Sequence, residues 1–192
     1  MSLKKDFHDY LSRFVNLKEE EISAFYRKAT IRKLKKREHF VKAGEHCSNV
    51  LFTNSGYLRF YHLSENGNEI TSDFYFAPSF ITSYTSFITK SQSLVSVQAM
   101  QDMEVLEFSR EDIYKLYAKY STVQTIGRMI AEQVAINSER HLFLLLGQSA
   151  ETRYKELMEK YPQHIQSIPL QYIASYLGIT KESLSRIRKS IH

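Results

Sequence analysis

The sequence predicts an α+β protein: an N-terminal antiparallel β-barrel or jelly roll with flanking helices, then a long helix, then a small all-α unit. Three observations predict this order. Residues 30–109 alternate short β-rich runs with turn signals, residues 120–146 carry apolar side chains at steps of three and four, and the chain ends in two short amphipathic helices. We therefore expect three parts, at residues 1–119, 120–147 and 148–192.

Two helical segments precede the β-rich region. Within residues 4–29, one apolar set lies before Leu17 and a second extends from Leu17 to Tyr26. The acidic residues 19–21 and the basic residues 27–28 suit the two ends of the second helix's dipole. We expect this pair of helices to flank the β-rich region.

The β-rich region is marked out by its turns. The run NSG at residues 54–56 indicates one turn, and NG at residues 66–67 separates the strand-like runs YLRFYHL and EITSDFYF. This pair tolerates the positive φ that a tight hairpin requires. Further strands are expected near 94–100 and 103–108. Several short strands at this spacing are typical of a small antiparallel barrel or jelly roll.

Two helices follow the β-rich region. Ser109 can cap a first helix, with Asp112 near the positive end of its dipole. The second helix covers about residues 120–146, ends near Gly147, and has apolar spacing that matches a helix–helix seam. The expected seam residues are Val123, Ile126, Ile130, Val134, Asn137, His141 and Leu144.

The C-terminal part has the pattern of a helix-turn-helix. Ser149 can cap a helix of its own, and Pro169 can occupy the first turn of the next. Gly178 lies where a helix end favours left-handed φ, and Thr180 can cap the last helix. Apolar residues fall at inward spacings, and Ala174 is small where two crossing helices must approach.

In a helix-turn-helix the second helix enters the major groove of DNA. Lys and Arg suit guanine, Glu can accept from cytosine, and a capping Thr with its neighbouring N–H groups suits a phosphate. Residues 148–192 carry seven Lys/Arg against four Asp/Glu, which favours a polyanion there. The alternative is an ordinary helical hairpin with a solvated basic face. The residues expected to contact DNA are Thr180, Lys181, Glu182, Ser185, Arg186, Arg188 and Lys189.

The composition excludes several classes of protein. No apolar run is long enough to span a membrane and the N-terminus has no apolar signal core, so we expect a cytoplasmic protein with no membrane partner. A single cysteine, Cys47, cannot form an intrachain disulfide or hold an iron–sulfur cluster. The histidines show no metal-ligand spacing, and no nucleophile elbow or phosphate loop is present. We expect no metal, no resident cofactor and no catalytic residues.

The order of barrel, long helix and helix-turn-helix resembles the Crp/Fnr family of bacterial transcription regulators. VKAGEHCSNVLFTNSGYLRFYHLSENGNEI resembles the family's barrel signature, and IASYLGITKESLSRIRK resembles its DNA-binding motif. In that motif the recognition trio corresponds to Lys181, Glu182 and Arg186. The resemblance implies that residues 1–119 form a cyclic-nucleotide-binding-like sensor barrel.

The resemblance also implies partners. The long helix would pair two copies of the chain, and the homodimer would bind a pseudo-palindromic site on double-stranded DNA, with RNA polymerase as a candidate further partner. Many members follow the recognition helix with a β-hairpin wing, whereas the printed chain ends six residues after Arg186. Natural absence of the wing and a shortened chain both remain open.

The sensor positions depart from the cyclic-nucleotide-binding pattern. Ser83 stands where the family has a Glu for the ribose, and Ser93 where it has an Arg for the cyclic phosphate. A hydroxyl supplies no charge, so we expect no cAMP binding, and an unknown effector stays open. The residues of a candidate ligand pocket are Ser83, Tyr84, Ser93, Asn137 and Ser138. The alternative for Asn137 and Ser138 is a polar interruption that sets the register of a helix pair.

Two further alternatives concern the whole chain. The basic run RKATIRKLKKR at residues 27–37 could contact DNA or form a solvated face. The protein as a whole could instead be a sensor or interaction module that acts through protein–protein contacts, with a weak or vestigial DNA-binding hairpin.

Overall fold

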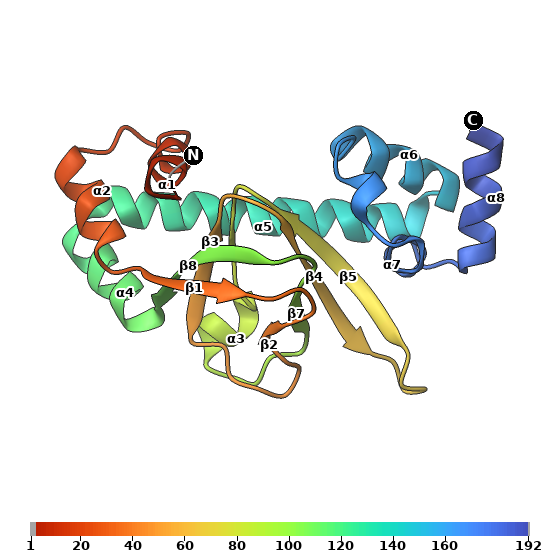
Figure 1. Ribbon diagram of the computed structural model, residues 1–192, viewed down its shortest axis with the longest axis horizontal. Coiled ribbons are helices and arrows are strands. Elements are labelled where there is room, and N and C mark those ends of the chain that lie inside the picture. The colour runs from red at the N-terminus through yellow and green to blue at the C-terminus, as the bar shows by residue number, and fades with distance from the viewer. Residues whose placement is uncertain (1–2, 192) are drawn as a thin grey trace. The chain divides into compact units, whose positions relative to one another are not determined.

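The computed structural model describes residues 3–191 and contains two compact units (Figure 1). The first consists of Met1–Phe60 and Phe74–Gln133, and the second of Tyr61–Asp73 and Val134–His192. The hairpin end Tyr61–Asp73 thus belongs to the same unit as the C-terminal helices. The predicted α+β class is confirmed.

Within the described residues, the strands form two four-stranded antiparallel sheets, as in a jelly roll. The predicted strands near 94–100 and 103–108 are β7 and β8. One sheet has the order β1 (Thr30–Leu34), β8 (Met103–Ser109), β3 (Asn49–Thr53), β6 (Ser79–Ile81). The other has the order β2 (His39–Val41), β7 (Ser96–Ala99), β4 (Tyr57–Leu63), β5 (Glu69–Phe76).

Strand β8 shows how the first unit is packed. Its residues alternate, so Met103 and Val105 join a cluster with side chains from both sheets, while Leu106 and Phe108 join a cluster with the helices. Apolar side chains of this strand are therefore buried on both of its faces, whereas Glu104 is exposed.

The helical cluster is dominated by aromatic rings. Helix α1 (Leu3–Leu11) contributes Phe7 and α2 (Glu19–Tyr26) contributes Phe25, and their ring centroids lie 5.1 Å apart, edge to face. Phe7 also stacks on Phe108 at 5.6 Å. The two helices expected before the β-rich region therefore cover one face of the first sheet.

The β4–β5 turn differs from the tight hairpin that residues 66–67 suggest. Gly67 has a φ of 78°, but Asn66 is not among the positive-φ residues. The N–H of Ser64 donates to the carbonyl of Asn68 (2.9 Å), so the chain reverses over a longer loop. A positive φ is needed at the glycine alone.

Two further helices of the first unit lie after β8 and between β6 and β7. Helix α4 (Arg110–Lys119) begins as predicted, with the Asp112 N–H donating to the Ser109 hydroxyl (3.1 Å). The short helix α3 (Tyr84–Thr89) was not predicted. Burial raises the pKa of Tyr117 on α4 to about 12.

Helix α5 (Ser121–Gly147) begins in the first unit and ends in the second. Early in the helix, Gly127 leaves space for the hydroxyl of Tyr117, because a Cβ at this position would overlap that oxygen. A glycine inside a helix costs about 1 kcal/mol relative to alanine, so this close approach has a local cost.

The second unit is mostly helical. It contains the end of α5, then α6 (Ala150–Lys160), a 3₁₀ turn (Ile165–Ser167), α7 (Leu170–Tyr176) and α8 (Lys181–Ile191). Ser149 caps α6, as expected, by accepting from the Thr152 N–H at 3.1 Å. The buried core of this unit includes Tyr154, Leu157, Ile168, Ile173, Ala174, Leu177 and Leu184.

Candidate nucleic-acid interface and effector site

The turn between α7 and α8 is built as the sequence suggests. Gly178 adopts a φ of 66°, and the Ile179 N–H donates to the Ala174 carbonyl (3.0 Å). The Thr180 hydroxyl accepts from the Ser183 N–H (3.2 Å), so Thr180 caps α8. Because Ala174 is buried, the two helices pack closely at this turn.

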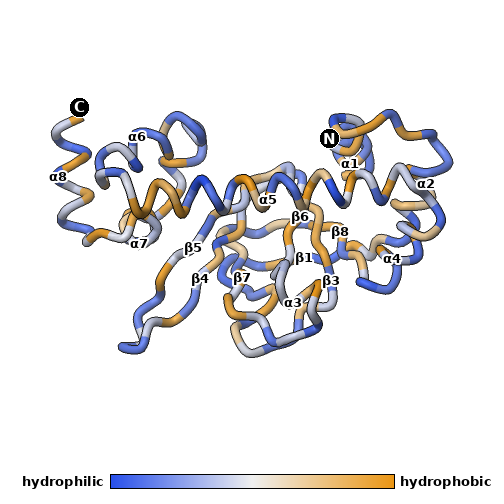
Figure 2. The backbone as a smooth tube through the Cα atoms, turned by 180° about the vertical axis from the view of Figure 1, so that it is seen from behind, coloured by the Kyte–Doolittle hydropathy of each residue, from blue (hydrophilic) through white to orange (hydrophobic). Residues whose placement is uncertain are grey.

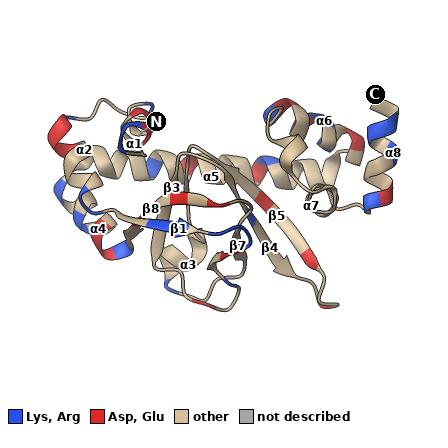
Figure 3. Ribbon diagram, viewed as in Figure 1, with Lys and Arg blue, Asp and Glu red and all other residues tan. Residues whose placement is uncertain are grey.

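Helix α8 carries several charged residues (Figure 3), and it has a buried apolar face and an exposed charged face. Leu184 is fully buried and Ile187 is half-buried. On the opposite side, Glu182, Arg186 and Lys189 are all exposed and form one stripe of the helix. These three side chains are therefore the best placed to enter a groove.

A second stripe of α8 lies roughly 100° round the helix from the first. It holds Lys181, Ser185 and Arg188, of which Ser185 is half-buried and the two cations are exposed. Of the DNA-contacting residues that the sequence suggests, these occupy the flank, where a phosphate backbone would pass. The Thr180 hydroxyl is engaged in the cap, and the residue is exposed at the start of the helix.

Arg186 has a positioning partner that the sequence did not reveal. Its Nη2 donates to the Ser183 hydroxyl (3.2 Å), and Ser183 is also the residue capped by Thr180. The Thr180–Ser183–Arg186 spacing of three residues is the available signal for this arrangement.

A second unpredicted residue, Arg153 on α6, holds the helix ends of this unit together. One Nη group donates to the Leu177 carbonyl at the end of α7 (2.6 Å). The other donates to the Gln148 carbonyl just beyond α5 (2.5 Å). The cation thereby satisfies carbonyls that a helix C-terminus leaves without an internal partner.

Helix α7 also contacts α5 and β5 within the second unit. The ring of Tyr176 stacks on that of His141, with centroids 4.6 Å apart. The neighbouring Ser175 hydroxyl accepts from the Thr71 N–H (2.8 Å) and donates to the Glu69 carbonyl (3.2 Å). Burial lowers the pKa of His141, and the charges of Lys160 and Arg153 lower it further.

The structure brings together two of the expected effector residues. The hydroxyl oxygens of Ser83 and Ser93 lie 2.7 Å apart, and the two residues are only 4% and 2% exposed. The Ser93 hydroxyl also lies 2.6 Å from the Val95 carbonyl. These hydroxyls already have hydrogen-bond partners and face no solvent, so they do not form an open anion site.

The other expected effector residues are more exposed. Tyr84, at the start of α3, is 42% exposed. Asn137 and Ser138 lie on α5 in the second unit, Asn137 half-buried and Ser138 exposed. The role of all five residues in ligand binding remains a prediction.

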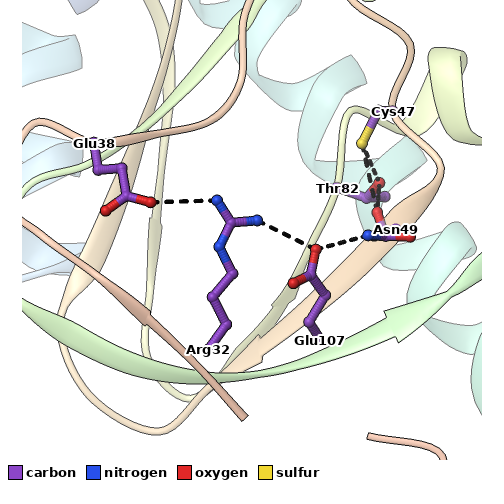
Figure 4. A network of polar contacts seen from close by, with 6 residues as sticks. All are labelled: Arg32, Glu38, Cys47, Asn49, Thr82 and Glu107. Carbon is purple, nitrogen blue, oxygen red and sulfur yellow. Dashed lines mark hydrogen bonds and ion pairs between the residues drawn. The ribbon is translucent and has the colours of Figure 1, made fainter. Parts of the chain in front are cut away.

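The basic run at residues 27–37 is partly neutralised by acidic side chains. Arg32 contacts both Glu38 and Glu107 at 3.3 Å, and Glu107 also accepts from the Asn49 side chain at 2.7 Å (Figure 4). Lys28 pairs with Asp112 at 2.8 Å. These contacts favour the reading of this run as a structural and solvated face.

Cys47, which Figure 4 also draws, is an internal residue. It is 3% exposed, and its Sγ lies 3.3 Å from the Thr82 hydroxyl. The Thr82 hydroxyl in turn donates to the Asn49 carbonyl at 2.8 Å. A buried thiol with this neighbour is a packing residue.

The apolar seam expected on α5 stays a prediction, and its residues differ in how deeply they are buried. Val123 and Ile126 are each 1% exposed, inside the helical cluster of the first unit, and Ile130 packs against that cluster. Val123 and Ile126 are therefore covered within this chain, and Ile130 is half-buried. Of the remaining seam residues, Val134, Asn137, His141 and Leu144 are half-buried.

A different face of α5 is apolar and exposed. Ile136 is 57% exposed, Phe143 63% and Leu146 80%, and their spacings of seven and three place them on one stripe. Figure 2 shows the apolar character of the last turns of this helix. Apolar residues thus recur every three or four positions on two faces of α5. The sequence pattern alone does not show which of these faces is exposed.

The part of the chain that the structure describes has neither a metal-ligand cluster nor a membrane-spanning helix. Residues 3–191 contain no group of three or more His, Cys, Asp or Glu side chains that could hold a metal ion. None of the helices in the same range is both long and apolar enough to cross a membrane.

The comparisons with known proteins agree with this geometry. Residues 31–120 match the family model of the cyclic nucleotide-binding domain. No curated protein sequence matches the chain. FixK2 from Bradyrhizobium japonicum is similar in structure with a TM-score of 0.74 and 20% identity, over 85% of this chain and 84% of its own.

Two other solved structures are similar over most of their length. The c-di-GMP-responsive regulator CLP from Xanthomonas campestris has a TM-score of 0.69 and 16% identity, over 91% of each chain. A regulator of the Crp/Fnr family from Eubacterium rectale also has a TM-score of 0.69, with 19% identity over 91% of this chain and 83% of its own. Residues 31–120 therefore resemble a cyclic nucleotide-binding domain, and the chain shares its overall fold with these solved structures.

Proposed function

We propose that this protein is a transcriptional regulator that binds a pseudo-palindromic DNA site as a homodimer. The observation that carries the proposal is α8, which is capped by Thr180, packed through Leu184, and exposes Glu182, Arg186 and Lys189 on one stripe. A helix of this kind fits the major groove, where Arg reads guanine and Glu reads cytosine.

The test begins with selection of a DNA site from random duplexes, followed by fluorescence anisotropy at fixed salt. Arg186→Ala is expected to weaken binding roughly tenfold to hundredfold, the loss of about 1–3 kcal/mol expected for a bidentate base contact. Arg13→Ala removes the same charge from an exposed position outside α8 and serves as the control. Equal DNA affinity of the wild type and Arg186→Ala would show that Arg186 does not contact a base.

The flank of α8 gives a second, distinct expectation. Arg188→Ala should weaken binding to all sequences alike and reduce the salt slope by about 0.9 on a log–log plot, because one phosphate contact is lost. Unlike Arg186→Ala, it should leave the preferred sequence unchanged. A changed sequence preference would place Arg188 among the base-reading residues.

For the dimer, the exposed stripe of Ile136, Phe143 and Leu146 supports pairing of α5 with a second copy. A soluble protein gains by covering such a stripe, and its heptad spacing suits a parallel helix pair. Ile136→Asp is expected to give monomers in sedimentation velocity. Gln163→Asp adds the same charge at an exposed position outside α5, and it should leave the dimer intact.

For the effector, we propose that cAMP is not the physiological ligand. The closed Ser83–Ser93 pair supports this, because neither hydroxyl carries a charge for a cyclic phosphate. Titration calorimetry with cAMP should show no binding in the micromolar range. A one-to-one micromolar isotherm would contradict the proposal.

The second candidate function is a sensor or interaction module that acts through protein contacts. The exposed apolar stripe of α5 is the observation that favours it, since a different protein could occupy that stripe. Failure of the wild-type protein to enrich any sequence in the DNA selection, together with a monomer in sedimentation, would support this function over the first.

A further inference from the structure

The edge of strand β5 carries a contact with the helix-turn-helix inside the second unit. β5 is the last strand in its sheet, so every second residue turns its N–H and C=O away from β4. Thr71 and Glu69 are two residues apart and turn these groups to the same side. Such an edge is normally left to water or covered by another element.

Ser175 covers this edge with a single hydroxyl. Its Oγ accepts from the Thr71 N–H (2.8 Å) and donates to the Glu69 carbonyl (3.2 Å). The hydroxyl therefore offers β5 one acceptor and one donor, as the backbone of a neighbouring strand would. Both contacts lie within the second unit.

The next residue fixes α7 from another direction. Tyr176 stacks on His141 of α5. Contacts from two consecutive residues to two different elements restrict both the sliding and the rotation of α7. A shift of α7 should also shift α8, because Ala174 of α7 and Leu184 of α8 are buried in the same small core.

We propose that Ser175 is a positioning residue that couples the β4–β5 hairpin to the DNA-reading helix. Residues 61–73 are the end of a hairpin whose other half belongs to the sensor unit. A shift of this hairpin would be transmitted through the Ser175 hydroxyl to α7 and from α7 to α8. The proposal rests on the DNA-binding function above and assigns to that site a route of regulation.

The first measurement needs no DNA. In hydrogen exchange with residue resolution, Ser175→Ala should accelerate exchange of the Thr71 amide by roughly three- to tenfold, the ratio that the loss of one hydrogen bond gives. Ser175→Thr keeps the hydroxyl and should restore slow exchange. Ser12→Ala is the matched control, since that hydroxyl donates to the His8 carbonyl within its own helix region.

The second measurement is DNA affinity of the same variants for the selected site. Ser175→Ala should weaken binding by a factor similar to its effect on exchange, because a smaller fraction of molecules holds α8 in the competent position. Ser175→Thr and Ser12→Ala should bind as wild type does. The contrast between Ala and Thr at position 175 separates loss of the hydroxyl from loss of helix packing.

Three outcomes would overturn the coupling. Faster exchange with unchanged DNA affinity would make Ser175 a cap for the strand edge alone. Unchanged exchange and unchanged affinity would mean that the contact does not hold the hairpin in solution. Wild-type protein that binds no DNA, while Ser175→Ala still accelerates exchange, would refute the proposed function and leave the contact as a structural one.

Discussion

The interactions inside the first unit differ in kind from those inside the second. In the first, rings from α2, β3 and the fully buried Phe108 of β8 pack around Phe7 of α1, with centroids 5 to 6 Å apart. In the second, several helix ends and a strand edge are joined by polar contacts from Arg153 and Ser175. Dispersion and apolar burial are non-directional, whereas hydrogen bonds specify orientation. The first unit is thus built for stability and the second for the placement of α8.

The largest expected effect tests the aromatic core. Phe108→Ala should lower the free energy of unfolding by about 3–5 kcal/mol, because it removes a buried ring and leaves a cavity. Urea denaturation followed by tyrosine fluorescence measures the change. Tyr114→Ala, at a position 47% exposed, is the control and should cost far less. A loss for Phe108→Ala as small as that of the control would remove the contrast between the units.

The next effect tests the polar junction of the second unit. Arg153→Met keeps much of the side-chain length but leaves the Leu177 and Gln148 carbonyls without their cation, at a cost of about 2 kcal/mol. Hydrogen exchange should then increase in α7 and α8. The amides of β8 should stay protected. Uniform acceleration over both units would show that they unfold as one.

A matched arginine sharpens this result. Arg140 in the same unit pairs with Glu156 at 3.0 Å, but its side chain is 64% exposed. Arg140→Met should therefore change stability by no more than about 0.5 kcal/mol. A loss equal to that of Arg153→Met would mean that charge, and not the capping of helix ends, stabilises this unit.

A smaller effect of opposite sign is expected at Thr71. Thr71 is 3% exposed, and its hydroxyl has no hydrogen-bond partner among the described residues. Thr71→Val replaces this hydroxyl with a methyl group of similar size and should stabilise the protein by about 1 kcal/mol. The thermal midpoint should rise accordingly. Destabilisation would indicate that the hydroxyl is hydrogen-bonded in solution.

The smallest expected effect is on the pH dependence of stability. The two units should lose stability over different pH ranges. Burial lowers the pKa of His141, so the unfolded chain binds the proton more readily than the folded one. The resulting stability is complete above the ordinary histidine pKa of about 6.5 and is lost as the pH falls through the folded value. Exchange in the second unit should accelerate over this range, and His141→Gln should abolish the dependence.

In the first unit the same reasoning applies to carboxylates. Hydrogen bonds from Lys28 and Ser109 lower the pKa of Asp112, and hydrogen bonds from Thr122 and Lys18 lower that of Glu21. Their contribution is complete above the ordinary values of 3.8 and 4.5 and is lost as the pH falls through the folded pKa values. Acid should therefore loosen the second unit before the first. The reverse order would contradict the assignment.

Local signals made much of this structure predictable. Three helices begin at the predicted capping residues, which are Ser109, Ser149 and Thr180. Gly178 has the positive φ that its position suggests. Such features depend on neighbouring residues only. The order of strands, long helix and helix-turn-helix follows from the same local patterns.

The features that escaped prediction depend on contacts far apart in the chain. Ser175 and Thr71 are separated by 104 residues, and no local pattern marks the pair. The apolar spacing of α5 does not distinguish its buried face from its exposed one, since burial of Val123 depends on rings from α1 and β8. The Arg153 contacts likewise join three helices, and a lone arginine in an amphipathic segment looks like a surface residue.

The Tyr117–Gly127 contact has a consequence for the evolution of this chain. Any side chain at position 127 would collide with the tyrosine hydroxyl, so that site can accept mutation only after position 117 has become smaller. The two positions should therefore covary among related sequences, with larger residues at 127 occurring together with shorter ones at 117. A phenylalanine at 117 would not be enough, because the ring carbons Cζ and Cε1 would remain 2.5 Å and 2.9 Å from the added Cβ.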